Sequence, residues 1–113
     1  MRTMYRQGDV LLVVSLKTPT PQAKAVTDRG RVILAYGEVT GHAHEVVPIA
    51  DNRDDVPAME LFEEPDGTRL LVVRRAVELR HEEHGRIALA PDVTYEVRRQ
   101  VEYTPAEIRT VSD

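Results

Sequence analysis

The chain contains four histidines, and all of them fall into two short motifs. His42 and His44 are separated by one residue, and His81 and His84 are separated by two. Neutral imidazole is a common ligand of transition metal ions, and two imidazoles side by side can hold one ion together. Metal coordination is therefore the chemistry that this pattern favours first.

The spacing within each pair decides how its two rings can meet. Residues i and i+2 of a strand point to the same face, so His42 and His44 can converge on one point. Residues i and i+3 of a strand point to opposite faces, so His81 and His84 can converge only in a turn or a helical turn. Gly85 follows His84 directly and favours such a turn.

We expect the two pairs to share one site if they lie at neighbouring strand ends. A carboxylate from Glu45, Glu82 or Glu83 would complete that site. The expected cofactor is a divalent transition metal ion: Zn, Ni, Mn or Fe. The alternative is that the histidines only hydrogen-bond to nearby carboxylates and bind no metal. The expected metal ligands are His42, His44, His81 and His84.

Most other catalytic patterns are missing from the sequence. There is no cysteine, which excludes disulfides, thiolate metal sites and iron–sulfur clusters. Neither Ser15 nor Ser112 stands in a Gly-x-Ser-x-Gly elbow, and no phosphate-binding or dinucleotide-binding glycine motif is present. Whether the chain is an enzyme stays open at this point.

The elements that must position the histidines are strands. β-Branched runs separated by Gly, Pro and Asp recur through the chain, which is typical of small all-β domains. Strands are expected over residues 10–16, 31–36, 42–47, 59–64, 68–79, 87–90 and 94–103.

The connections between these strands carry their own signals. A kink is expected near Arg74-Arg75, with the strand running on to Leu79. The turn at Pro91-Asp92 predicts a last hairpin, and the segment 104–107 (Thr-Pro-Ala-Glu) resembles the start of a helix. The expected fold class is all-β, a small antiparallel barrel or sandwich with a short C-terminal helix, in a single domain over residues 1–113.

Two arginines, Arg75 and Arg99, interrupt strand faces that are otherwise apolar. Such a residue marks either a contact between subunits or a partly buried ion pair, here with Glu38 or Asp9. The first interpretation predicts a homo-oligomer or a protein partner.

Composition limits the other partners. The 113 residues carry a net charge of −4 and only 4% aromatic side chains, so a nucleic-acid-binding surface is poorly supplied. No apolar run approaches the roughly 18 residues of a membrane-spanning helix, and the first residues lack the apolar segment of a signal peptide. We therefore expect no nucleic acid or membrane partner, and a cytoplasmic location.

The chain resembles two groups of proteins. Gly37 followed by His42-Ala43-His44 is similar to the first motif of the cupin family, and the turn at Pro91 resembles the proline turn of the second cupin motif. Small bacterial β-rich proteins of no assigned function are similar over the whole chain. That similarity is carried by residues 6–12, 37–44, 79–84 and 98–105.

These resemblances have different implications. The second group implies a common fold and a shared histidine cluster, without an activity. The cupin resemblance implies a metal-dependent enzyme, with Glu45 or Glu83 as the base. The function favoured by the sequence is a small metal-binding β-barrel protein that acts as a binding or accessory module. The alternatives are a cupin-like enzyme, or a metal-free structural subunit of a multiprotein or phage-type assembly.

Overall fold

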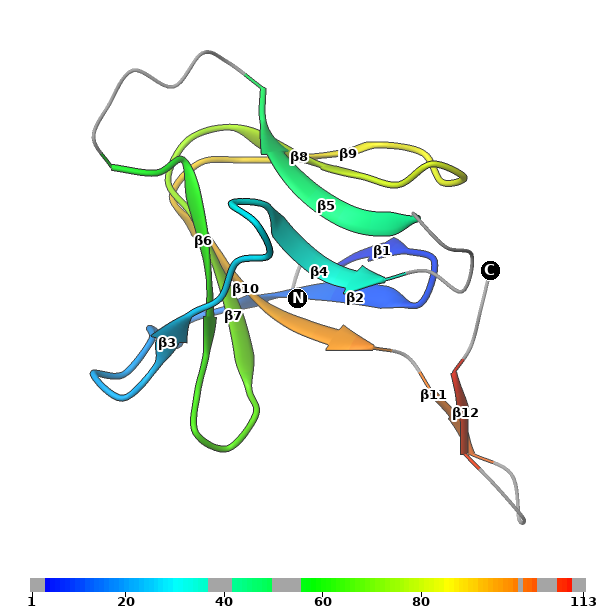
Figure 1. Cartoon of the computed structure of the whole chain (residues 1–113), viewed down its shortest axis with the longest axis horizontal. Helices are drawn as coiled ribbons and strands as arrows, with labels where there is room; N and C mark the ends of the chain where they lie inside the picture. Colours follow the sequence, from blue (N-terminus) through cyan, green and yellow to red (C-terminus); the bar gives the residue numbers. More distant parts are fainter. Residues whose placement is uncertain (1–3, 37–41, 50–55, 100, 104–107, 111–113) are drawn as a thin grey trace.

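The computed structural model describes residues 4–36, 42–49, 56–99, 101–103 and 108–110. All regular elements in these residues are strands, and every strand pair is antiparallel (Figure 1). The strands are β1 (Met4–Gln7), β2 (Val10–Ser15), β3 (Lys24–Ala25), β4 (Val32–Tyr36), β5 (Ala43–Pro48), β6 (Met59–Glu63), β7 (Arg69–Val73), β8 (Val77–Arg80), β9 (Ile87–Leu89), β10 (Val93–Arg99), β11 (Val101–Tyr103) and β12 (Ile108–Thr110). No helix able to cross a bilayer occurs in this part of the chain.

Two sheets form the body of the protein. The larger has six strands in the order β1-β2-β10-β7-β6-β3, and the smaller has four in the order β4-β5-β8-β9. Leu12 and Tyr95 of the larger sheet and Leu34, Val46 and Leu79 of the smaller are fully buried in one apolar cluster. Each sheet thus buries one face against the other. The all-β prediction is confirmed, but the described strands do not close into a barrel.

The chain changes sheet where the sequence pattern predicted one continuous strand. β7 ends at Val73 in the larger sheet, and β8 begins at Val77 in the smaller. The amides of Arg74 and Arg75 both donate to the carbonyl oxygen of Ala58, at 2.7 and 3.2 Å, and hold this corner. The predicted break near Arg74-Arg75 is confirmed, but the continuation of the same strand to Leu79 is wrong.

The turn at Pro91-Asp92 also joins the two sheets. Asp92 has a positive φ of 63°, as a tight turn requires. β9 before the turn pairs with β8, whereas β10 after it lies between β2 and β7. The predicted last hairpin is therefore wrong. β10 instead pairs with β2 and β7 in the larger sheet, and its side chains Tyr95 and Val97 are buried in the core.

The C-terminal segment is a strand. Residues 104–107, where the helix was expected to begin, lie outside the described residues. Ile108–Thr110 forms β12 and pairs with β11, so the predicted C-terminal helix is wrong at these residues. Ile108 and Thr110 are β-branched, which favours the extended conformation. The β11–β12 pair projects away from the two larger sheets (Figure 1).

Candidate metal centre

Three segments that are distant in sequence meet at one side of the protein. They are the β1–β2 turn, the beginning of β5 and the loop between β8 and β9 (Figure 1). β5 and β8 pair antiparallel, with Glu45 opposite Arg80. The start of β5 therefore lies beside the end of β8, and the two histidine motifs are adjacent in space.

All four histidine rings lie together. The ring centroids of His44 and His81 are 4.3 Å apart, and those of His81 and His84 are 4.6 Å apart. His44 and His84 are separated by 5.8 Å, and His42 and His81 by 5.7 Å. The second pair converges because His81 and His84 occupy an irregular loop and not a strand.

The carboxylate of Glu82 lies close to two of the four rings. The nitrogen and oxygen ligand atoms of His42, His81 and Glu82 all lie within 4.8 Å of one another. Glu82 Oε2 also accepts a hydrogen bond from the amide of Ala43 at 3.1 Å, which anchors the loop to β5. Backbone hydrogen bonds, including this one, lower the pKa of Glu82, so the carboxylate is charged at neutral pH.

The other two candidate glutamates differ in position. Glu83 Oε1 lies 3.4 Å from His42 Nδ1, at the exposed edge of the cluster. Glu45 follows His44 on β5 and therefore points to the opposite face, where it accepts two hydrogen bonds from Arg31, at 2.8 and 3.1 Å. The structure thus brings Glu82 and Glu83 to the histidines but not Glu45.

Gln7 determines which nitrogen of His44 carries the proton. The side-chain amide of Gln7 donates to the carbonyl oxygens of Leu79 and Gly85, at 3.0 and 2.9 Å. Its oxygen is therefore turned towards His44, where Oε1 lies 2.8 Å from Nδ1. An amide oxygen can only accept, so His44 donates from Nδ1 and leaves the lone pair on Nε2 free.

His44 is buried as a neutral imidazole. Burial is the main cause that lowers its pKa to about 4, and His81, His84 and Arg99 add to it, while Asp9 opposes it. The free Nε2 faces Asp9 Oδ1 at 3.7 Å. A lone pair and a carboxylate oxygen do not attract one another, but a cation between them would be bound by both.

The buried polar residues of the described chain are all at this place: Gln7, Asp9 and His44. Buried polar groups are costly unless they are paired, so their concentration here is informative. The sequence did not single out Gln7 as a site residue. Its only signal is a polar side chain at the end of a strand, which many surface residues share.

Asp9 is also the acidic partner of Arg99. The guanidinium of Arg99 donates to Asp9 Oδ2 from Nε at 3.0 Å and from Nη2. The expected ion pair with Asp9 is therefore present, and Glu38, the other expected partner, lies outside the described residues. Because Arg99 forms an ion pair with an acidic residue of its own chain, its position does not by itself call for a partner subunit.

His81 is held differently from His44. Its Nδ1 accepts a hydrogen bond from the amide of Glu83 at 3.0 Å, so the neutral ring carries its proton on Nε2. Burial and the neighbouring His84 and His42 lower its pKa. An ion that bound His81 through Nδ1 would have to replace the Glu83 amide.

Gly8 is packed directly against the cluster. It has a positive φ of 58°, and a β-carbon at this position would lie 3.0 Å from His84 Nε2 and 3.1 Å from His44 Cε1. Only glycine adopts this conformation without strain and also leaves room for both rings. The β1–β2 turn therefore closes one side of the histidine cluster.

Comparison with protein families matches residues 6–100 to the family described as Domain of unknown function (DUF8820). No curated protein and no solved structure matches the chain. The matched residues include all four histidines as well as Gln7, Gly8 and Asp9. The match agrees with the resemblance to proteins of no assigned function, and it extends over most of the chain. The chain therefore belongs to the DUF8820 family.

Proposed function

We propose that this protein is a small metal-binding β domain that holds one divalent transition metal ion in its histidine cluster. The proposed ligands are His42, His44, His81 and His84, with the carboxylate of Glu82 as an oxygen ligand. Zn, Ni, Mn and Fe all accept imidazole and carboxylate donors.

The observation that carries the proposal is the convergence of all the histidines of the chain with Glu82 at one place. Ligand atoms bound to one ion at about 2.1 Å lie about 3.0 Å apart in octahedral and about 3.4 Å apart in tetrahedral geometry. The ligand atoms of His42, His81 and Glu82, within 4.8 Å of one another, need only a small inward movement. His81 and Glu82 lie in the β8–β9 loop, where such a movement disturbs no strand pairing.

The surroundings of His44 support the same function. Ligand histidines commonly donate their second ring N–H to a fixed acceptor, which orients the ring and raises its basicity. The hydrogen bond from His44 Nδ1 to Gln7 Oε1 has this form. Asp9 Oδ1, on the other side of the ring, adds negative charge next to the free nitrogen.

A metal-dependent enzyme is the second candidate. The compact group contains two histidines and one carboxylate, a ligand set that leaves coordination positions open for water or substrate. Glu83 would then be the base, because Glu45 is bound to Arg31 on the opposite face. X-ray absorption of the loaded protein separates the two: a sphere filled by protein donors favours a binding module, and bound water favours an enzyme.

The test is titration calorimetry with zinc, nickel and manganese on the chelator-treated full chain. We expect one ion per chain, with His42→Ala and His84→Ala each weakening affinity by more than about tenfold. Glu45→Gln is the matched control, because it changes a neighbour of His44 on the other face and should leave affinity unchanged. No binding by the wild type, or equal binding by all variants, would refute the shared site.

A further inference from the structure

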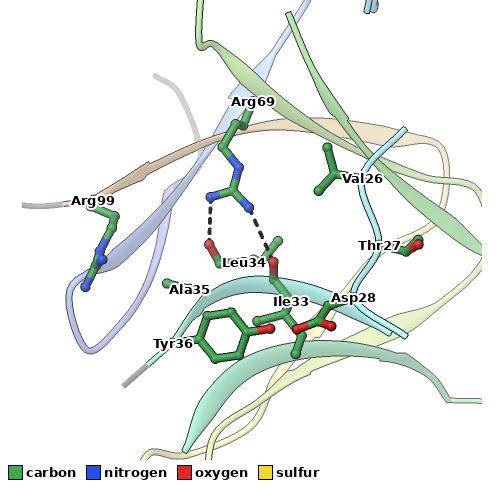
Figure 2. A pocket seen from close by; sticks show the side chains of 9 residues that line it. All are labelled: Val26, Thr27, Asp28, Ile33, Leu34, Ala35, Tyr36, Arg69 and Arg99. Carbon is green, nitrogen blue, oxygen red and sulfur yellow. Dashed lines mark hydrogen bonds between the residues drawn. The ribbon is translucent and has the colours of Figure 1, made fainter. Parts of the chain in front are cut away.

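A cavity lies between the two sheets, apart from the histidine cluster, and no histidine is among its described lining residues. Its volume is about 370 Å³, within the usual range for small-molecule pockets of roughly 300–1,000 Å³. Val26 and residues of β4 provide a largely apolar lining. Figure 2 shows Arg69 of β7 reaching across to the carbonyl groups of Leu34 and Ile33 on β4, and Arg99 of β10 at the end of the cavity that is farther from Asp28.

Among the residues that the structure describes, the hydrogen-bond partners of the Arg69 guanidinium are neutral. It donates from Nη1 to the carbonyl oxygen of Leu34 at 2.7 Å and from Nη2 to that of Ile33 at 3.3 Å (Figure 2). These bonds use two of the five N–H groups of arginine. Glu63 lies opposite Arg69 in the β6–β7 register, but no carboxylate of the described residues forms an ion pair with it.

A half-buried cation without a carboxylate is unfavourable in a partly apolar cavity. Burial lowers the pKa of Arg69, and repulsion from Arg99 lowers it further, although Glu63 opposes both. Arg99 is already neutralised by Asp9. Among the described residues, the guanidinium of Arg69 thus has no paired carboxylate, and an anion bound beside Arg69 and Arg99 would supply one.

We propose that this cavity binds a small organic anion, with a carboxylate or phosphate group on Arg69 and Arg99. The remaining N–H groups of the two guanidinium groups can donate to either head group, because a carboxylate and a phosphate each offer at least two acceptor oxygens. The apolar body of the ligand would lie along Val26 and β4. Asp28 lines the end of the cavity that is farther from Arg99 (Figure 2). A ligand with a second negative group at that end is therefore disfavoured.

The probes are benzoate and phenyl phosphate, with benzyl alcohol as the neutral analogue and inorganic phosphate as the head group alone. Binding is measured by calorimetry and by amide shifts in NMR spectra, in a buffer free of carboxylate and phosphate. We expect benzoate or phenyl phosphate to bind at millimolar concentration or better and to shift the amides of β4. The stronger of the two identifies the head group. Benzyl alcohol should bind at least about tenfold more weakly.

Variants assign the binding to Arg69. Arg69→Gln should lower the affinity for the anion by at least about tenfold. Arg98→Gln, which changes the exposed residue next to Arg99, should leave the affinity unchanged. Arg99→Gln is the second variant and should weaken binding even if Arg69→Gln fails to fold. His42→Ala should leave anion binding unchanged, so this result is independent of the metal centre. Absence of binding, equal binding of benzyl alcohol, or equal binding by all arginine variants would overturn the proposal.

Discussion

Gln7 Oε1 lies 2.8 Å from His44 Nδ1, and this contact fixes the tautomer of the most buried histidine. Both amide hydrogens of Gln7 are held by backbone carbonyls, those of Leu79 and Gly85, so the side chain cannot turn over without losing two bonds. The ring of His44 therefore presents an unprotonated Nε2 towards Asp9, in the form that a metal ion requires.

Gln7→Leu should destabilise the fold by about 3 kcal/mol, because it leaves the buried Nδ1 of His44 without an acceptor and removes a hydrogen bond from the carbonyl groups of Leu79 and Gly85. Urea unfolding of the metal-free protein measures this change. Gln22→Leu, at an exposed position, is the control and should cost less than about 0.5 kcal/mol. Similar unfolding midpoints for the two variants would show that the Gln7 network contributes little.

Gly8→Ala should cost more stability than Gly30→Ala. Both glycines have positive φ angles, 58° and 80°, so both substitutions cause backbone strain of about 1–2 kcal/mol. Only at Gly8 does the added carbon meet His84 and His44; nothing lies within 4 Å at Gly30. We expect a further loss of about 1 kcal/mol at Gly8, with altered ring signals of His44 and His84 in NMR spectra. An equal cost at both positions would contradict the close packing of the turn against the rings.

Acid should destabilise the metal-free protein through His44. In the unfolded chain this histidine takes up a proton near its ordinary pKa of 6.5, whereas in the folded chain it does so only near pH 4. The unfolded state therefore binds more protons between these values, and stability falls as the pH is lowered from about 6.5 to about 4. Above pH 6.5 the contribution of His44 is complete, on the order of 3 kcal/mol.

His44→Gln tests this pH dependence, because glutamine does not titrate. The variant should show a smaller loss of unfolding free energy between pH 7 and pH 5 than the wild type, and NMR titration should place the His44 transition well below pH 6.5. The lowered pKa of His81 acts in the same direction, so part of the slope remains in the variant. A wild-type stability that is constant over this range would show that His44 is not buried as a neutral ring.

Metal binding should release the amide of Glu83. This amide donates to His81 Nδ1, the ring nitrogen whose lone pair an ion would need. Zinc addition should therefore speed hydrogen exchange at the Glu83 amide. The Gln7 side-chain amide is an internal control, because its bonds to Leu79 and Gly85 need not change. A bound ion that leaves the Glu83 amide protected would exclude Nδ1 of His81 as a ligand.

Local pattern in the sequence determined most of the strands. Short apolar runs bounded by turn residues predicted β2, β4, β6 and β10 to within a few residues, because side-chain alternation and turn residues act over short distances. The local pattern did not determine the pairing partner of every strand. The turn at Pro91-Asp92 has the chemistry of a hairpin, yet the strands on either side belong to different sheets.

The same division holds for the histidine cluster. The spacing within each pair predicted that its two rings can converge. The rings of His81 and His84 do lie 4.6 Å apart, whereas His42 and His44 each contact His81. Their meeting depends on the register of β5 with β8, and the neutral tautomer of His44 depends on Gln7 from β1. These contacts join residues far apart in the chain, and their energies come from burial and pairing in the assembled core. The sequence therefore determined which residues are candidate metal ligands, and only the tertiary structure decided which of them lie together.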